Sequence, residues 1–129
     1  MIKAIVSTLT LLILDGIFLG LIAKKLYLTE IGNIMRLSQG SLHPLWIPVV
    51  IVYAMLILGI LFFVIPKAEG IPLHALLWGA LFGLITYGVY DFTNLAILTN
   101  WTLKISIIDT LWGMTLCGIT SFVTVLITQ

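Results

Sequence analysis

Four long apolar stretches, separated by short polar segments, make up most of the chain. They cover residues 2–23, 45–65, 72–98 and 103–127. A helix needs about 20 apolar residues to cross the hydrocarbon core of a bilayer, so each stretch can form one span. Pro44, Pro66 and Pro72 stand at the expected helix ends, where a missing N–H does little harm. The pattern predicts an all-α fold: one domain, a compact bundle of four transmembrane helices.

The first connection is longer than the other two. Within residues 26–42, Leu and Ile recur among polar neighbours, which fits a short helix lying along the membrane interface. An ordered loop with a few buried side chains fits equally well, and both interpretations stay open. Lys3 before the first apolar stretch is also typical of a signal peptide. The length of that stretch, Asp15 within it and the absence of a small-residue cleavage site favour a retained helix.

Composition agrees with a membrane protein and excludes several other classes. Of 129 residues, 61% are hydrophobic and 9% charged, against about 45–50% and about 25% in soluble domains. The net charge of +1 and the lack of a basic stripe give no support for nucleic-acid binding. Cys117 is the single cysteine, and no Cys/His cluster or phosphate-binding loop is present. We therefore expect no metal, no cofactor and no nucleic-acid partner.

The basic residues in the loops predict an orientation. One side of the membrane carries Lys24, Lys25, Arg36 and Lys104, and the other carries Lys3 and Lys67. Because loops rich in Lys and Arg stay in the cytoplasm, the first and third loops are predicted to be cytoplasmic. Both termini would then lie outside the cytoplasm.

Three of the five acidic residues, Asp15, Asp91 and Asp109, fall within apolar stretches. A charged side chain there costs about 2.5–3.5 kcal/mol, so such residues usually face a protein interior or a wet cavity. At about 1.5 Å per residue, all three lie about 9–12 Å from the side of the first loop. Tyr53 lies at a similar depth. We expect one shared polar pocket that opens toward the first loop.

Helical spacing adds neighbours to the three acids. Tyr87, Tyr90 and Asn94 share a helix face with Asp91, and Trp112 shares one with Asp109. The candidate ligand-binding or proton-binding residues are Asp15, Asp91, Asp109, Tyr53, Tyr87, Tyr90, Asn94 and Trp112.

Two interpretations of this cluster remain open. In the first, the acids hydrogen-bond to their neighbours and serve only to pair the helices. In the second, they bind a proton, a cation or a polar head group. Carboxylates held close together in a low dielectric oppose each other's ionisation, so at least one is expected to be protonated near neutrality.

Two motifs resemble those of a known family. Tyr-Asp-x-Thr-Asn stands at residues 90–94, and Asp-x-x-Trp-Gly at residues 109–113. Together with residues 15–20, residues 79–83 and Trp101, they closely resemble a family of small bacterial membrane proteins, domain of unknown function 2177. The resemblance covers nearly the whole chain, with Phe18 and Thr102 as departures where Trp and Pro are expected. It implies a four-helix protein of the bacterial inner membrane and no established activity.

The leading functional hypothesis is an acidic intramembrane pocket that binds or transports a small cationic or amphipathic molecule, with proton linkage as an option. The alternative is a membrane-embedded enzyme, or enzyme partner, that acts on lipids with an Asp as general acid or base. An enzyme is the less favoured of the two, and an assembly role is the third. The expected partners are membrane lipid and a small-molecule ligand. A homodimer is an option, because a chain this short leaves little room for alternating access.

Overall fold

The computed structural model describes all 129 residues, and four of its helical segments are long and apolar enough to cross a membrane. The first span consists of α1 (Ile2–Ile17) and a π-helix, η1 (Phe18–Ile22). The second consists of α3 (Trp46–Gly59), a π-helix, η2 (Ile60–Val64), and a 3₁₀ turn, η3 (Pro66–Ala68). The others are α4 (Pro72–Ile97) and α5 (Leu103–Ile127). The predicted all-α bundle of four membrane helices is confirmed.

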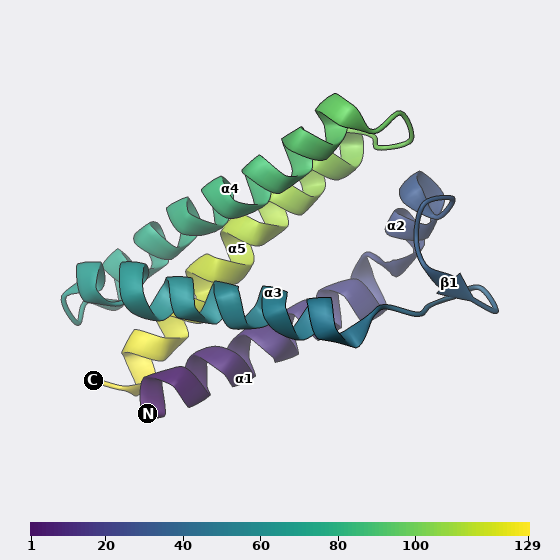
Figure 1. The fold of residues 1–129 in the computed structure, drawn as a ribbon. Coiled ribbons are helices and arrows are strands. Elements are labelled where there is room, and N and C mark those ends of the chain that lie inside the picture. The colour runs from purple at the N-terminus through teal and green to yellow at the C-terminus, as the bar shows by residue number, and fades with distance from the viewer.

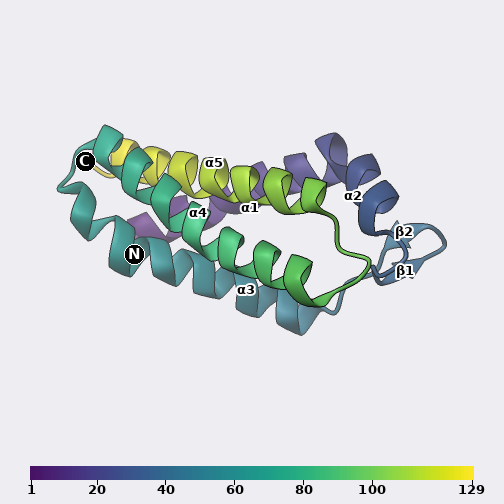
Figure 2. The same ribbon diagram turned by 90° about the horizontal axis from the view of Figure 1, so that it is seen from above.

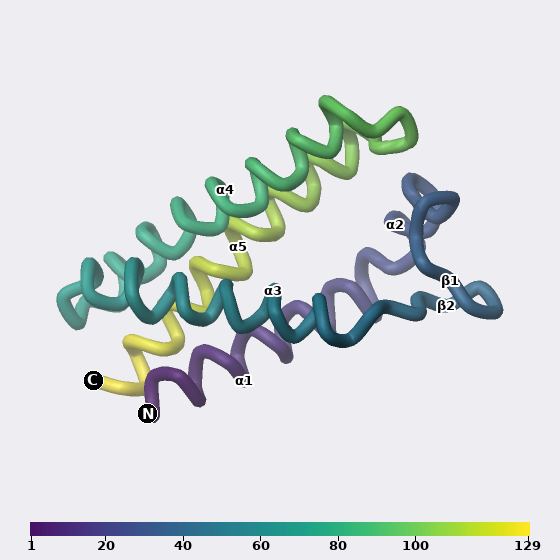
Figure 3. Tube along the Cα trace, in the orientation of Figure 1, coloured from purple at the N-terminus to yellow at the C-terminus, as the bar shows by residue number.

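The four spans converge at one end of the bundle and spread apart toward the other. Figure 1 shows α4 and α5 side by side, converging with α1 and α3 at the end that holds both termini. Toward the opposite end, α1 and α3 spread away from the α4–α5 pair, and the Cα trace in Figure 3 follows the same divergence. Seen from above, both termini again lie at one end and α2 at the other (Figure 2). We call the end opposite the termini the α2 end.

Small residues allow α4 and α5 to pack closely along their lengths. A Cβ on Gly83 would overlap the backbone carbonyl of Gly113, and one on Gly113 would overlap the Tyr87 ring. Close backbone approach at small residues is the usual way for membrane helices to associate, because lipid removes the hydrophobic driving force between them.

Helix α5 is the central helix of the bundle. Half of the most apolar part of its span is buried inside the protein, against less than a quarter for each of the other spans. Its buried face carries polar side chains at helical spacing: Ser106, Asp109, Thr110, Thr120, Ser121 and Thr124. One of them, Thr124, is linked to Ser7 of α1 by a hydrogen bond of 2.9 Å between their hydroxyl oxygens. A polar face of this kind is suited to neighbouring helices rather than to lipid.

The first connection differs in detail from the expectation. The short helix, α2 (Lys24–Ile31), begins two residues before the expected 26–42 segment. The rest of that segment holds a hairpin of β1 (Leu37–Ser38) and β2 (Ser41–Leu42). Its turn places Gln39 and Gly40 at φ 51° and 76°, as a two-residue hairpin turn requires. The pattern of Leu and polar residues in this segment did not show where the helix ends and the hairpin begins.

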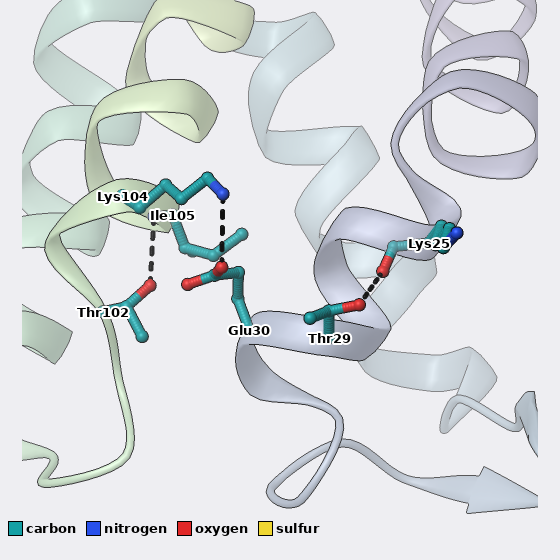
Figure 4. Close-up of polar contacts among 6 residues, drawn as sticks. All are labelled: Lys25, Thr29, Glu30, Thr102, Lys104 and Ile105. Atoms are coloured by element: carbon teal, nitrogen blue, oxygen red, sulfur yellow. Dashed lines mark hydrogen bonds and ion pairs between the residues drawn. The ribbon is translucent and has the colours of Figure 1, made fainter.

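Figure 4 shows polar contacts of α2 and of the start of α5, one of which joins the two helices. Glu30 of α2 forms an ion pair with Lys104 of α5, with 3.4 Å between Oε1 and Nζ. The Thr102 hydroxyl accepts a hydrogen bond of 3.2 Å from the Ile105 N–H and caps α5. Thr102, a departure from the family pattern, therefore has a structural use, since Thr is a favourable N-cap residue.

Candidate functional site

The three aspartates of the spans are all buried: Asp15 is 5% exposed, Asp91 0% and Asp109 9%. They come from α1, α4 and α5 and lie in the half of each helix nearest the α2 end. Their hydrogen-bond partners differ, and the partners indicate what each acid can do.

Asp15 has both carboxyl oxygens occupied by protein donors. The Tyr53 hydroxyl donates to Oδ2 at 2.5 Å, and Trp112 Nε1 donates to Oδ1 at 2.8 Å. The Phe18 ring stacks on the Trp112 ring, with 4.0 Å between centroids. These contacts join α1 and η1 to α3 and α5. A carboxylate held by two donors in this way is suited to pairing helices.

Asp109 receives a hydrogen bond on Oδ1 from the phenol of Tyr27 in α2. Burial, followed by the Asp109 carboxylate, raises the pKa of Tyr27, with smaller contributions from Asp91 and Asp15. The phenol therefore stays protonated and donates. No protein donor occupies the second oxygen of Asp109, and the side chain lines two cavities.

Asp91 is completely buried and only partly paired. Thr110 donates to its Oδ2 over 3.4 Å, while its Oδ1 has no protein donor. The Asp109 carboxyl lies near Asp91, and no hydrogen bond joins the two. One proton shared between these two acids would satisfy the buried oxygen, since neighbouring carboxyl groups cannot easily both ionise.

The remaining predicted site residues are Tyr87, Tyr90 and Asn94, all on α4. Tyr87, whose ring covers Gly113, lies near both Asp15 and Asp109. Tyr90 packs edge-on against Trp101, with 5.8 Å between ring centroids. Asn94 lies four residues after Tyr90 on α4 and has no hydrogen bond to any of the three acids.

Two cavities meet at Asp109 and Tyr90. The larger, which we call the α3–α4 cleft, has a volume of about 940 Å³, and nine of its twelve lining residues are hydrophobic. The smaller, which we call the loop-end cavity, has a volume of about 490 Å³ and lies between α2, the hairpin and the start of α5. The cleft walls include Val52, Met55, Phe62, Phe82, Thr86 and Tyr87. The polar and aromatic walls of the loop-end cavity are Lys24, Tyr27, Ser41, Tyr90, Trp101 and Asp109.

Sequence reasoning missed Tyr27 and Lys24 as site residues. Both lie in the connection after the first span, which the apolar pattern marks only as a boundary. The available signal was a Tyr three residues after a Lys in the one connection long enough to fold back over the bundle. No group of three or more His, Cys, Asp or Glu side chains is arranged to hold a metal ion.

Comparison with known proteins gives one match. No curated protein and no solved structure matches the chain. Residues 1–126 match a family described as a predicted membrane protein, DUF2177, in agreement with the motifs at residues 90–94 and 109–113. The chain therefore belongs to this membrane protein family, domain of unknown function 2177.

Proposed function

We propose that the protein binds an amphipathic membrane molecule, with the apolar part in the α3–α4 cleft and a cationic or hydrogen-bond-donating group against Asp109. The observation that carries this proposal is a largely apolar cleft that has a buried carboxylate in its wall. Ligand sites are typically apolar cavities with a few polar groups that fix orientation, and this cleft has that composition.

The walls of the cleft support entry from the lipid side. Met55, Phe62 and Phe63 line it and are 68%, 69% and 67% exposed. In a membrane span, apolar side chains this exposed contact acyl chains. A molecule dissolved in the bilayer would therefore reach the cleft without first crossing into water.

The free oxygen of Asp109 supports the choice of polar group. A carboxylate accepts hydrogen bonds and attracts cations, and the Tyr27 hydrogen bond to Oδ1 leaves Oδ2 available. Binding of a cationic group there would favour loss of the proton shared with Asp91. That exchange supports a proton-linked form of the proposal, in which binding extends to transport.

A photoactivatable hexadecylamine with a diazirine in its chain tests this proposal in nanodiscs. We expect crosslinks on α3 and α4 cleft residues, several-fold fewer in Asp109→Asn because the charge that attracts the amine is removed. Met55→Trp should fill the cleft and reduce crosslinking. Val50→Trp changes an exposed position of the same helix outside the cleft and should leave crosslinking unchanged. Labelling spread evenly over all lipid-facing helices, and equal in all variants, would refute the proposal.

The buried Asp91–Asp109 pair favours one second candidate, a membrane-embedded enzyme or enzyme partner that acts on lipids. Two neighbouring buried carboxyl groups, one of which has an oxygen without a donor, are suited to general acid–base catalysis. The purified protein would then convert a lipid, and Asp91→Asn would abolish product formation while crosslinking of the amine probe persists. Crosslinking without product, from a broad lipid extract, would favour binding or transport.

A further inference from the structure

The loop-end cavity continues from the α3–α4 cleft at Asp109 and Tyr90, which line both. A ligand bound in the cleft with a polar group on Asp109 therefore has room beyond that group, toward α2 and the hairpin. What lines this further space decides the chemistry of the rest of the ligand.

Lys24 gives the loop-end cavity a free positive charge. It is the only basic residue in the wall, and it forms no ion pair. The single ion pair of the protein joins Lys104 to Glu30 (Figure 4), and the acid in the cavity wall, Asp109, accepts a hydrogen bond from Tyr27. Lys24 is exposed, so a ligand group that reaches its ammonium lies at the mouth of the cavity. An anion is favoured there, and phosphate is a usual partner of Lys.

The depths of Lys24 and Asp109 set the order of groups along the ligand. Lys24 begins α2, directly after the first span, and so lies at the level where head groups begin. Asp109 is six residues into α5, about 9 Å from the start of that helix at about 1.5 Å per residue, and it also lines the cleft. From the cleft outward, the ligand would carry an apolar chain, then a hydrogen-bond donor, then an anion.

We infer, on the basis of the proposed function, that the ligand is a single-chain lipid phosphate with a free hydroxyl or amine between its chain and its phosphate, as in a lysophospholipid. The hydroxyl would donate to Asp109 and the phosphate would contact Lys24. A diacyl phospholipid fits less well, because at that depth it offers ester oxygens, which only accept hydrogen bonds and would face a carboxylate. A monoacylglycerol has the donor but lacks the anion.

Competition against the photoactivatable hexadecylamine tests this inference in nanodiscs. The competitors are palmitoyl lysophosphatidic acid, monopalmitoylglycerol and dipalmitoyl phosphatidic acid. We expect the lysophosphatidic acid to compete about tenfold better than either of the others, as one charge-assisted contact predicts. Lys24→Gln should remove its advantage over monopalmitoylglycerol. Lys25→Gln removes an adjacent charge that lines neither cavity and should preserve the advantage.

The outcomes separate this inference from the proposed function. Equal competition by lysophosphatidic acid and monopalmitoylglycerol in the wild type, with crosslinking still confined to the cleft, overturns the inference alone. An advantage that persists in Lys24→Gln also overturns it. Loss of cleft-specific crosslinking overturns the proposed function as well. Because Lys24 is exposed, its replacement is not expected to unfold the protein, and an unchanged thermal unfolding midpoint checks this.

Discussion

Asp15 offers a direct test of how the acids divide between structure and function. Asp15→Ala would remove two hydrogen bonds and leave the Tyr53 hydroxyl and Trp112 Nε1 without their acceptor. A hydrogen bond to a charged group contributes about 1.5–3 kcal/mol in soluble proteins. Polar contacts between membrane helices average about 0.6 kcal/mol, with a maximum of about 1.7. Two contacts at membrane values give an expected loss of about 1–3 kcal/mol in the free energy of unfolding.

Asp15→Asn should be much milder, for a reason that depends on the donors. Trp112 Nε1 can only donate, so the amide oxygen must face it, while the Tyr53 hydroxyl can turn and accept from the amide nitrogen. Both hydrogen bonds are retained without the charge, and we expect a loss below about 1 kcal/mol. The amide also removes the cost of burying an ionisable group.

Unfolding in mixed micelles by a denaturing detergent, followed by Trp fluorescence, measures these differences. Thr8→Ala is the matched control on α1, because its hydroxyl bonds only to the Ala4 carbonyl of the same helix, at 2.7 Å. It should change stability little. The structural role assigned to Asp15 is wrong if the free energy of unfolding of Asp15→Ala lies within about 0.5 kcal/mol of the wild-type value. It is also wrong if Asp15→Asn loses as much stability as Asp15→Ala.

Three further predictions concern packing, α2 and topology. Gly83→Val should destabilise the protein by about 1–3 kcal/mol, since the valine side chain would overlap α5. Gly88→Ala should not, because the nearest atom to the new Cβ lies at 3.7 Å. Thermal unfolding in detergent compares the two variants. Tyr27→Phe removes the hydrogen bond from α2 to Asp109 and should speed amide exchange in α2; exchange as slow as in the wild type would contradict the tie. Reporter enzymes fused after Gln129 should be active only when they function outside the cytoplasm; activity of a cytoplasmic reporter would reverse the orientation predicted from the loop charges.

The spans could be predicted from the sequence because each is a long apolar run bounded by polar residues. The second span shows the limit of that reading: it continues past Pro66 to Ala68, because a proline is tolerated at the first position of a helical turn. Asp15, Asp91 and Asp109 stood out because ionisable residues are costly in such runs. Tyr53 and Trp112 could be placed near them from depth and helix face.

The contact between α2 and the buried acids could not be predicted, because no periodicity relates α2 to the spans. Tyr27 reaches Asp109 across 82 positions of the chain, and only the three-dimensional path of the connection determines this contact. The different partners of the acids were equally inaccessible: Asp15 has two donors, whereas Asp109 and Asp91 have one each. These partners depend on which side chains fill the space between helices, and depth alone does not specify that.

The π-helix Phe18–Ile22 has a consequence for how α2 is aimed. A π turn is equivalent to one extra residue accommodated within an α-helix. Since an α-helix advances about 100° per residue, that residue rotates everything after it by about a quarter turn about the helix axis. Tyr27 therefore points toward Asp109, and Lys24 toward the loop-end cavity, only if the first span keeps its number of residues. Deletion of a single residue from residues 18–22 would leave the span long enough to cross the membrane. It would, however, rotate Lys24 and Tyr27 away from the loop-end cavity.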